Sequence, residues 1–139
     1  LGFAVFFAIQ QYRYRNSPEY QAIKYFDDLK SKYENDTYGG ATPEETLQLF
    51  IDALKKGDVE LASKYFVVEK QEEKLADFKI GKEKENLEKL ISILLHLNHK
   101  TSYSDGSYEI SILEKDKPIE YGVHFVLNEK TRKWKIERL

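Results

Sequence analysis

Five aromatic residues in the last third of the sequence have types and spacing suited to lining a pocket. On one concave face of a sheet, such rings would hold an apolar ligand while tyrosine hydroxyls orient it. The alternative is that they fill the hydrophobic core against helices. The candidate pocket residues are Tyr103, Tyr108, Tyr121, Phe125 and Trp134.

Three histidines are the candidate metal ligands or general bases. His96 and His99 are three residues apart near the expected end of a helix, where they could share a metal with His124. The alternative is that imidazoles suit the negative end of a helix dipole. No carboxylate motif accompanies them, so the sequence predicts no metal site and no cofactor.

Motifs of the common catalytic sites are missing from the sequence. It has no glycine-rich phosphate loop, no GxSxG and no HExxH. It also has no cysteine, which excludes thiolate nucleophiles, thiolate zinc sites and disulfides. Adjacent acids such as Glu44 and Glu45 diverge on a helix. Because side chains alternate along a strand, His124 should lie on the face opposite Phe125. We therefore predict a filled or weakly polar pocket with no catalytic residue; a deep open cavity with His124, Asp105 or Glu120 pointing into it would favour an enzyme instead.

The elements that position these side chains are helices followed by strands. Helix starts are indicated at Ser17-Pro18, Thr42-Pro43 and Asp58, each followed by apolar residues at helical spacing. Residues 42–45 form a capping box, in which Thr42 accepts from the amide of Glu45 and Glu45 reaches back to the amide of Thr42. Further helices are expected over residues 69–78 and 82–97, the last one burying a leucine stripe centred on Leu90.

An alternating pattern takes over after Lys100 and predicts strands. Asp105-Gly106 indicates a two-residue hairpin turn. Hairpins in succession give an antiparallel meander of about four strands with one apolar face for the helices to cover. The predicted fold class is therefore α+β, with N-terminal helices packed on a curved antiparallel sheet. The longest and the last strand are indicated by Ile119, Tyr121, Val123, Phe125, Leu127, Trp134 and Ile136.

The first nine residues are apolar and uncharged, and Tyr12, Arg13, Tyr14 and Arg15 follow almost at once. A membrane-spanning helix needs roughly 20 apolar residues, so nine cannot span. We expect the exit end of a spanning helix with interfacial tyrosine and arginine anchors. The alternatives are a remnant of a signal-peptide apolar region or an ordinary buried helix start.

Three parts follow along the chain. Residues 1–16 would be the end of a membrane anchor and its interfacial segment, residues 17–41 a juxtamembrane helix and linker, and residues 42–139 the main domain. Residues 35–40, rich in Asn, Asp and Gly, are the clearest linker. We expect a membrane-anchored protein with an extracytoplasmic soluble domain, although Arg13 and Arg15 alone would favour the cytoplasmic side.

The charge balance of the sequence argues against nucleic acid as a partner. The 22 basic and 24 acidic residues give a net charge of −2, whereas nucleic-acid binding usually requires a basic face. We therefore predict that no nucleic acid is bound.

Two stretches resemble a known superfamily. Residues 42–66, which begin TPEETLQLF and continue through the Gly57-Asp58 turn, resemble the opening of cone-shaped domains like nuclear transport factor two. Residues 121–127 and 132–136 resemble their closing hairpin. The resemblance covers residues 42–139 and is closest to bacterial membrane-anchored or lipoprotein domains, many of unknown function. It implies a cone-like fold, but no catalytic Asp, His or Tyr of the enzymatic members matches a position here.

Together these features predict a non-catalytic, membrane-tethered domain for protein–protein interaction, scaffolding or small-ligand binding. Its expected partners are a membrane, through the N-terminal segment, and a second protein or further copies of itself. The alternative is a small lyase or isomerase that uses a cone pocket, as the resemblance allows.

Overall fold

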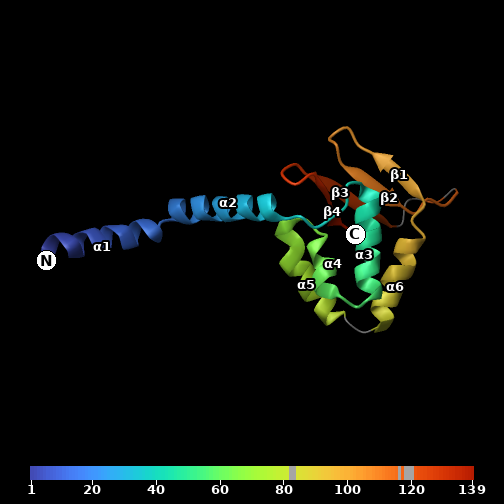
Figure 1. The fold of residues 1–139 in the computed structure, drawn as a ribbon, viewed down its shortest axis with the longest axis horizontal. Helices are drawn as coiled ribbons and strands as arrows, with labels where there is room; N and C mark the ends of the chain where they lie inside the picture. The colour runs from blue at the N-terminus through green and yellow to red at the C-terminus, as the bar shows by residue number, and fades with distance from the viewer. Residues whose placement is uncertain (82–83, 116, 118–120) are drawn as a thin grey trace. The chain divides into compact units, whose positions relative to one another are not determined.

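The computed structural model describes residues 1–81, 84–115, 117 and 121–139, and the chain forms two units (Figure 1). The first unit, residues 1–35, contains helices α1 (Gly2–Arg15) and α2 (Pro18–Asn35). The second unit, residues 36–139, contains the remaining helices followed by an antiparallel sheet. This order confirms the α+β class and the prediction that helices precede the sheet.

The first unit consists of two exposed helices. At the start of α2, the Ser17 hydroxyl accepts a hydrogen bond from the Tyr20 amide at 3.2 Å, as the Ser-Pro pair predicts. The rings of Tyr14 and Tyr20 meet across the junction, with centroids 5.2 Å apart. Neither helix buries a residue. Within the described part of the chain, no helix combines the length and the apolar character needed to cross a bilayer.

Helix α3 (Pro43–Lys55) begins at a cap that differs in one bond from the predicted capping box. Thr42 Oγ1 accepts from the Glu45 amide at 3.2 Å, as expected. The Glu45 carboxylate accepts instead from the Ala41 amide, at 2.7 Å. After α3, Gly57 takes a φ of +69° and Asp58 caps α4 (Val59–Lys64) by accepting from the Leu61 amide at 2.9 Å. This glycine supplies the left-handed turn that ends the helix.

A 3₁₀ turn, η1 (Val68–Lys70), leads into α5 (Gln71–Ile80), and α6 (Lys84–Leu95) completes the helices. Three phenylalanines, Phe50, Phe66 and Phe78, form the centre of the core, with ring centroids 5.5 to 6.0 Å apart. On α6, Leu94 is buried, whereas Leu90 is half-buried at the margin of this core. The expected helix start at Lys82 lies outside the described residues.

The sheet contains β1 (His99–Ser102), β2 (Tyr108–Ser111), β3 (Gly122–Asn128) and β4 (Lys133–Arg138), in that spatial order and all antiparallel. The predicted four-strand meander is therefore confirmed. The turn between β1 and β2 is longer than predicted: the Tyr103 amide donates to the Ser107 carbonyl, and Gly106 adopts a φ of +84°. Such a three-residue loop places a glycine in the left-handed region. Ile119 and Glu120 lie outside the described residues.

The outer edge of β4 is covered by two segments from earlier in the chain. The Trp134 amide donates to the Gly40 carbonyl, and the Ile136 amide donates to the Tyr65 carbonyl. A Cβ at Gly39, whose φ is +122°, would lie 2.3 Å from the Trp134 carbonyl oxygen. The two glycines that the sequence indicates as a linker thus lie against the sheet. Covering this edge removes a row of unpaired backbone groups that would otherwise invite strand pairing.

Candidate functional site

Three of the five predicted pocket residues meet on one side of the sheet. Tyr108 lies opposite Phe125 across the β2–β3 ladder, and Phe125 lies opposite Ile136 across β3–β4. The rings of Tyr108 and Trp134 contact edge to face, with centroids 6.3 Å apart. Phe125 is fully buried, while Tyr108 and Trp134 are half-buried against the core.

The other two predicted pocket residues are separated from each other. Tyr121 packs against the same core, and burial raises the pKa of its hydroxyl. Tyr103 is exposed at the β1–β2 turn, where its ring contacts His124 with centroids 5.9 Å apart. The structure therefore groups Tyr108, Phe125 and Trp134, places Tyr121 against the core before the start of β3, and places Tyr103 beside His124.

Tyr108 also takes part in a polar contact at the start of α3. Its hydroxyl donates to Glu44 Oε1 at 3.0 Å, and the Lys100 ammonium lies 2.8 Å from the same oxygen. The hydrogen bond from Lys100 lowers the pKa of Glu44, and desolvation raises the pKa of Tyr108. From the sequence, Glu44 is only one of two adjacent acids within the capping-box residues 42–45. Its ion pair with Lys100 and its hydrogen bond from Tyr108 could not be predicted from the sequence, because both partners lie in strands far along the chain.

An open hollow of about 360 Å³ lies beside the β1–β2 and β3–β4 turns. His124 borders it from the strand position next to Phe125, whose side chain points to the core face. His124 Nδ1 lies 2.9 Å from Glu137 Oε2 and has no hydrogen-bond partner of suitable geometry. The hollow is lined by Asp105, Gly106, Ser107, His124, Val126, Leu127, Glu129, Arg132 and Glu137.

This hollow is the closest arrangement to acid–base chemistry among the described residues. A carboxylate beside one imidazole nitrogen can stabilise a protonated histidine and leave the other nitrogen for a substrate. Asp105 is held by Ser107, whose hydroxyl donates to Asp105 Oδ1 at 2.6 Å and lowers its pKa. The hollow thus contains a histidine in contact with the Glu137 carboxylate, and Asp105 is a second acid in its lining.

The remaining histidines lie elsewhere. His96 Nδ1 is 2.6 Å from the Ser92 carbonyl oxygen, one turn back on α6, and His99 begins β1. Among the described residues, no group of three or more His, Cys, Asp or Glu side chains is placed to hold a metal ion.

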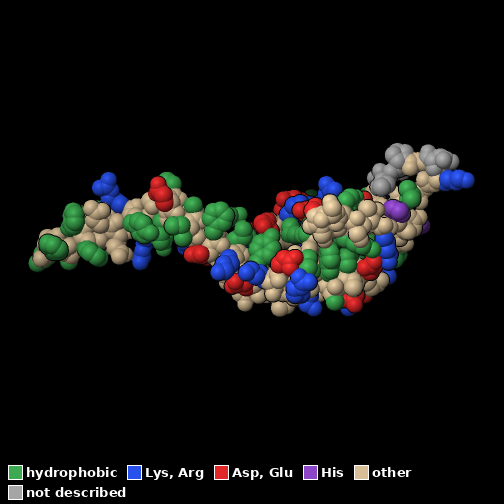
Figure 2. All heavy atoms as spheres, turned by 90° about the horizontal axis from the view of Figure 1, so that it is seen from above, with side chains coloured by type: hydrophobic (Ala, Val, Ile, Leu, Met, Phe, Trp, Pro, Cys, Tyr) green, Lys and Arg blue, Asp and Glu red, His purple; other side chains and the backbone are tan. Residues whose placement is uncertain are grey.

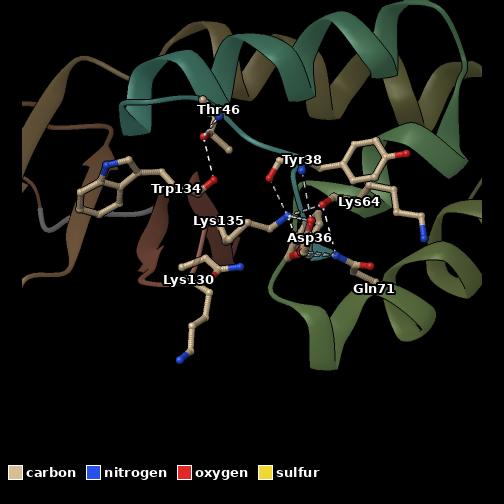
Figure 3. A network of polar contacts seen from close by, with 11 residues as sticks. Asp36, Tyr38, Thr46, Lys64, Gln71, Lys130, Trp134 and Lys135 are labelled. Carbon is tan, nitrogen blue, oxygen red and sulfur yellow. Dashed lines mark hydrogen bonds and ion pairs between the residues drawn. The ribbon is translucent and has the colours of Figure 1, made fainter. Parts of the chain in front are cut away.

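A buried ion pair joins the start of the second unit to its last strand (Figure 3). The Lys135 ammonium lies 2.9 Å from Asp36 Oδ2 and donates to the carbonyls of Tyr38 and Lys64 at 2.9 and 2.6 Å. Lys135 Nζ also donates to Asp36 Oδ1 at 3.0 Å, and Gln71 Nε2 donates to Asp36 Oδ2 at 3.0 Å. All three ammonium protons therefore have acceptors, which a buried lysine requires. The side chains of Asp36 and Lys135 are inaccessible to a substrate, so this cluster stabilises the fold.

Most of the exposed large apolar side chains among the described residues belong to the first unit. Phe3 is 88% exposed, and the other large apolar side chains of residues 1–9 are also exposed. Hydrophobic side chains line the N-terminal helices in the face shown in Figure 2. Soluble proteins rarely expose contiguous apolar surface of this kind unless it contacts a membrane or a partner. On α2, Ile23, Tyr25 and Phe26 extend the exposed set.

Comparisons with known proteins do not assign the chain to a family. The sequence matches no family model, no curated protein and no solved structure. The resemblance to cone-shaped domains consequently stays a prediction.

Proposed function

We propose that the chain is a non-catalytic domain tethered to a membrane by α1. The observation that carries this proposal is the exposure of every large apolar side chain in residues 1–9. Burying one such side chain in an apolar environment is worth about 1.5–3 kcal/mol. Several together provide ample free energy for membrane association.

In this proposal α2 is a juxtamembrane helix and the second unit is the functional domain. That domain would bind a protein partner, scaffold an assembly or hold a small ligand. Support comes from exposed apolar residues on several of its elements: Leu49, Ile80, Ile93, Leu95 and Leu113. The cone-like fold and the extracytoplasmic location belong to the same proposal. The helix-then-meander order supports the former, and a cysteine-free composition is compatible with the latter.

Membrane association is tested by flotation with phospholipid vesicles. The 139-residue chain should float with vesicles, and Phe6→Glu/Phe7→Glu should leave it in the soluble fraction, because glutamate is costly to place in hydrocarbon. Ile80→Glu is the matched control: Ile80 is equally apolar in character and 85% exposed, but lies in the second unit. A chain that stays soluble in the presence of vesicles, or an Ile80 variant that fails equally, contradicts the proposal.

A lyase or isomerase is the second candidate, and the hollow beside His124 is the observation that favours it. His124 would remove a carbon-bound proton from a small substrate while Glu137 stabilises the imidazolium. The site lies on the opposite face of the sheet from Tyr108, Phe125 and Trp134, so it would be independent of that aromatic group.

Proton exchange tests this candidate without knowledge of the substrate. A panel of small ketones and 2-oxoacids in D₂O, followed by ¹H NMR, would report abstraction of carbon-bound protons. His124→Gln should slow exchange by at least about 100-fold, whereas His96→Gln, outside the hollow, should not. Exchange no faster than in buffer, or equal exchange by the His124 variant, removes this candidate.

A further inference from the structure

The apolar side chains of residues 1–9 surround the helix axis. Successive residues of an α-helix are turned by about 100°, so these side chains spread over roughly two-thirds of the circumference. A helix that lies flat on a membrane has one apolar and one strongly polar face. Residues 1–9 lack that division and have no charged side chain. The large apolar residues are Leu1, Phe3, Val5, Phe6, Phe7 and Ile9, all exposed.

Directly after this segment, residues 12–15 form what we call the collar. Tyr12, Arg13, Tyr14 and Arg15 are consecutive, so their side chains point to four different sides of α1. All four are exposed. Tyrosine rings favour the level of lipid headgroups, and guanidinium groups bind phosphate oxygens in a bidentate manner. A ring of such side chains fits a helix that passes through the headgroup layer.

The arginines of the collar are available for lipid. Among the described residues, neither guanidinium has an ion-pair or hydrogen-bond partner, and the first acidic residue in the sequence is Glu19, in α2. Arg13 and Arg15 lie about 200° apart around the axis but only about 3 Å apart along it. In a flat helix they could not both face the phosphates, whereas in an end-on helix they lie at nearly the same depth.

We propose that α1 enters an anionic bilayer end-on, with residues 1–9 in hydrocarbon and the collar among the lipid phosphates. This inference rests on the proposed membrane association and adds its orientation and its lipid class. Nine helical residues rise about 14 Å, which is close to half of the ~30 Å hydrocarbon core. Residues 1–9 would therefore occupy about half of the hydrocarbon core.

A depth scan tests the orientation. Because the chain has no cysteine, single cysteines placed at each position from 3 to 9 can carry a nitroxide label. Accessibility to oxygen and to a water-soluble nickel complex is then measured in vesicles of phosphatidylcholine and phosphatidylglycerol. We expect immersion to decrease steadily from position 3 to position 9. Immersion that rises and falls with the helical period would show a flat helix and overturn the proposal. Failure of the unlabelled chain to bind these vesicles would instead contradict the membrane association itself.

Charge neutralisation tests the lipid class. Arg13→Gln/Arg15→Gln should weaken binding to phosphatidylglycerol-containing vesicles by about 30-fold, because each basic residue near an anionic surface contributes about fivefold. Binding to pure phosphatidylcholine should be unchanged. Lys55→Gln/Lys56→Gln, which removes the same charge from exposed positions of the second unit, should bind like the original chain. Equal losses in both double variants, or no loss in the arginine variant, would overturn the anionic preference.

Discussion

Replacing Asp36 with alanine is expected to lower the free energy of unfolding of the second unit by about 3–5 kcal/mol. The substitution leaves the Lys135 ammonium, whose side chain is 1% exposed, without its counter-ion. The carbonyls of Tyr38 and Lys64 would still accept hydrogen bonds, but neutral oxygens do not balance a buried charge. Urea unfolding followed by circular dichroism measures the change.

A double variant separates the lost charge balance from lost packing. Asp36→Ala/Lys135→Met removes both charges and should recover much of the stability, because replacing a whole buried pair by apolar groups is often neutral. Glu114→Ala, which breaks the exposed pair with Lys117, should cost at most about 1 kcal/mol. If Asp36→Ala is no more costly than Glu114→Ala, the buried pair does not stabilise the unit.

The same pair gives a dependence on pH. Desolvation lowers the pKa of Lys135 below its ordinary value, against the opposing effect of the hydrogen bond to Asp36. Between the lowered pKa and the ordinary one, the unfolded chain holds a proton on Lys135 that the folded unit lacks. The free energy of unfolding should therefore rise with pH across this window. Lys135→Met should lack that contribution to the slope.

Phe66→Ala is expected to destabilise the second unit by about 3–5 kcal/mol. Phe66 is fully buried, and its ring lies 5.5 Å from that of Phe50 and 5.9 Å from that of Phe78. Its backbone also bridges to Ile136 in β4, so the emptied volume would lie between the helices and the sheet. Thermal unfolding of the purified chain reports the loss.

Ile80→Ala is the matched control for this substitution. Ile80 is 85% exposed at the end of α5, so its truncation should change the free energy of unfolding by no more than about 0.5 kcal/mol. Similar losses from Phe66→Ala and Ile80→Ala would show that the phenylalanine cluster is not the centre of the core.

The features predicted correctly from the sequence are those specified by neighbouring residues. The caps at Ser17, Thr42 and Asp58 are bonds to amides three residues ahead, so the local sequence contains both partners. The antiparallel meander was predicted for the same reason, because alternating apolar residues mark the strands and turn residues mark the hairpins between them. The position of the turn at Gly106 was predicted correctly, but its length was not. Two- and three-residue loops both favour glycine in the left-handed region, so the residue types do not distinguish them.

The features that sequence reasoning missed depend on residues distant in the chain. Gly39 lies in a stretch with the composition of a free linker, but a Cβ there would lie 2.3 Å from the carbonyl oxygen of Trp134, so glycine is necessary. Lys135 lies in a strand among charged neighbours, where a lysine is ordinarily exposed. Its burial depends on an aspartate 99 positions earlier. Tyr103 lies apart from the other predicted aromatic residues, because it belongs to the turn after β1 and not to a strand.

The contact between Asp36 and Lys135 also constrains when the protein can finish folding. Asp36 leaves the ribosome 99 residues before the lysine that neutralises it, and the edge of β4 that Gly40 pairs with is made equally late. Helices α3 and α4 can form early, because their caps are local. Contacts between residues so far apart in the sequence can form only after the intervening residues have been synthesised. During synthesis the nascent chain thus carries a completed N-terminal half whose stabilising strand has yet to be translated. Its exposed apolar core at that stage is the kind of surface that molecular chaperones bind.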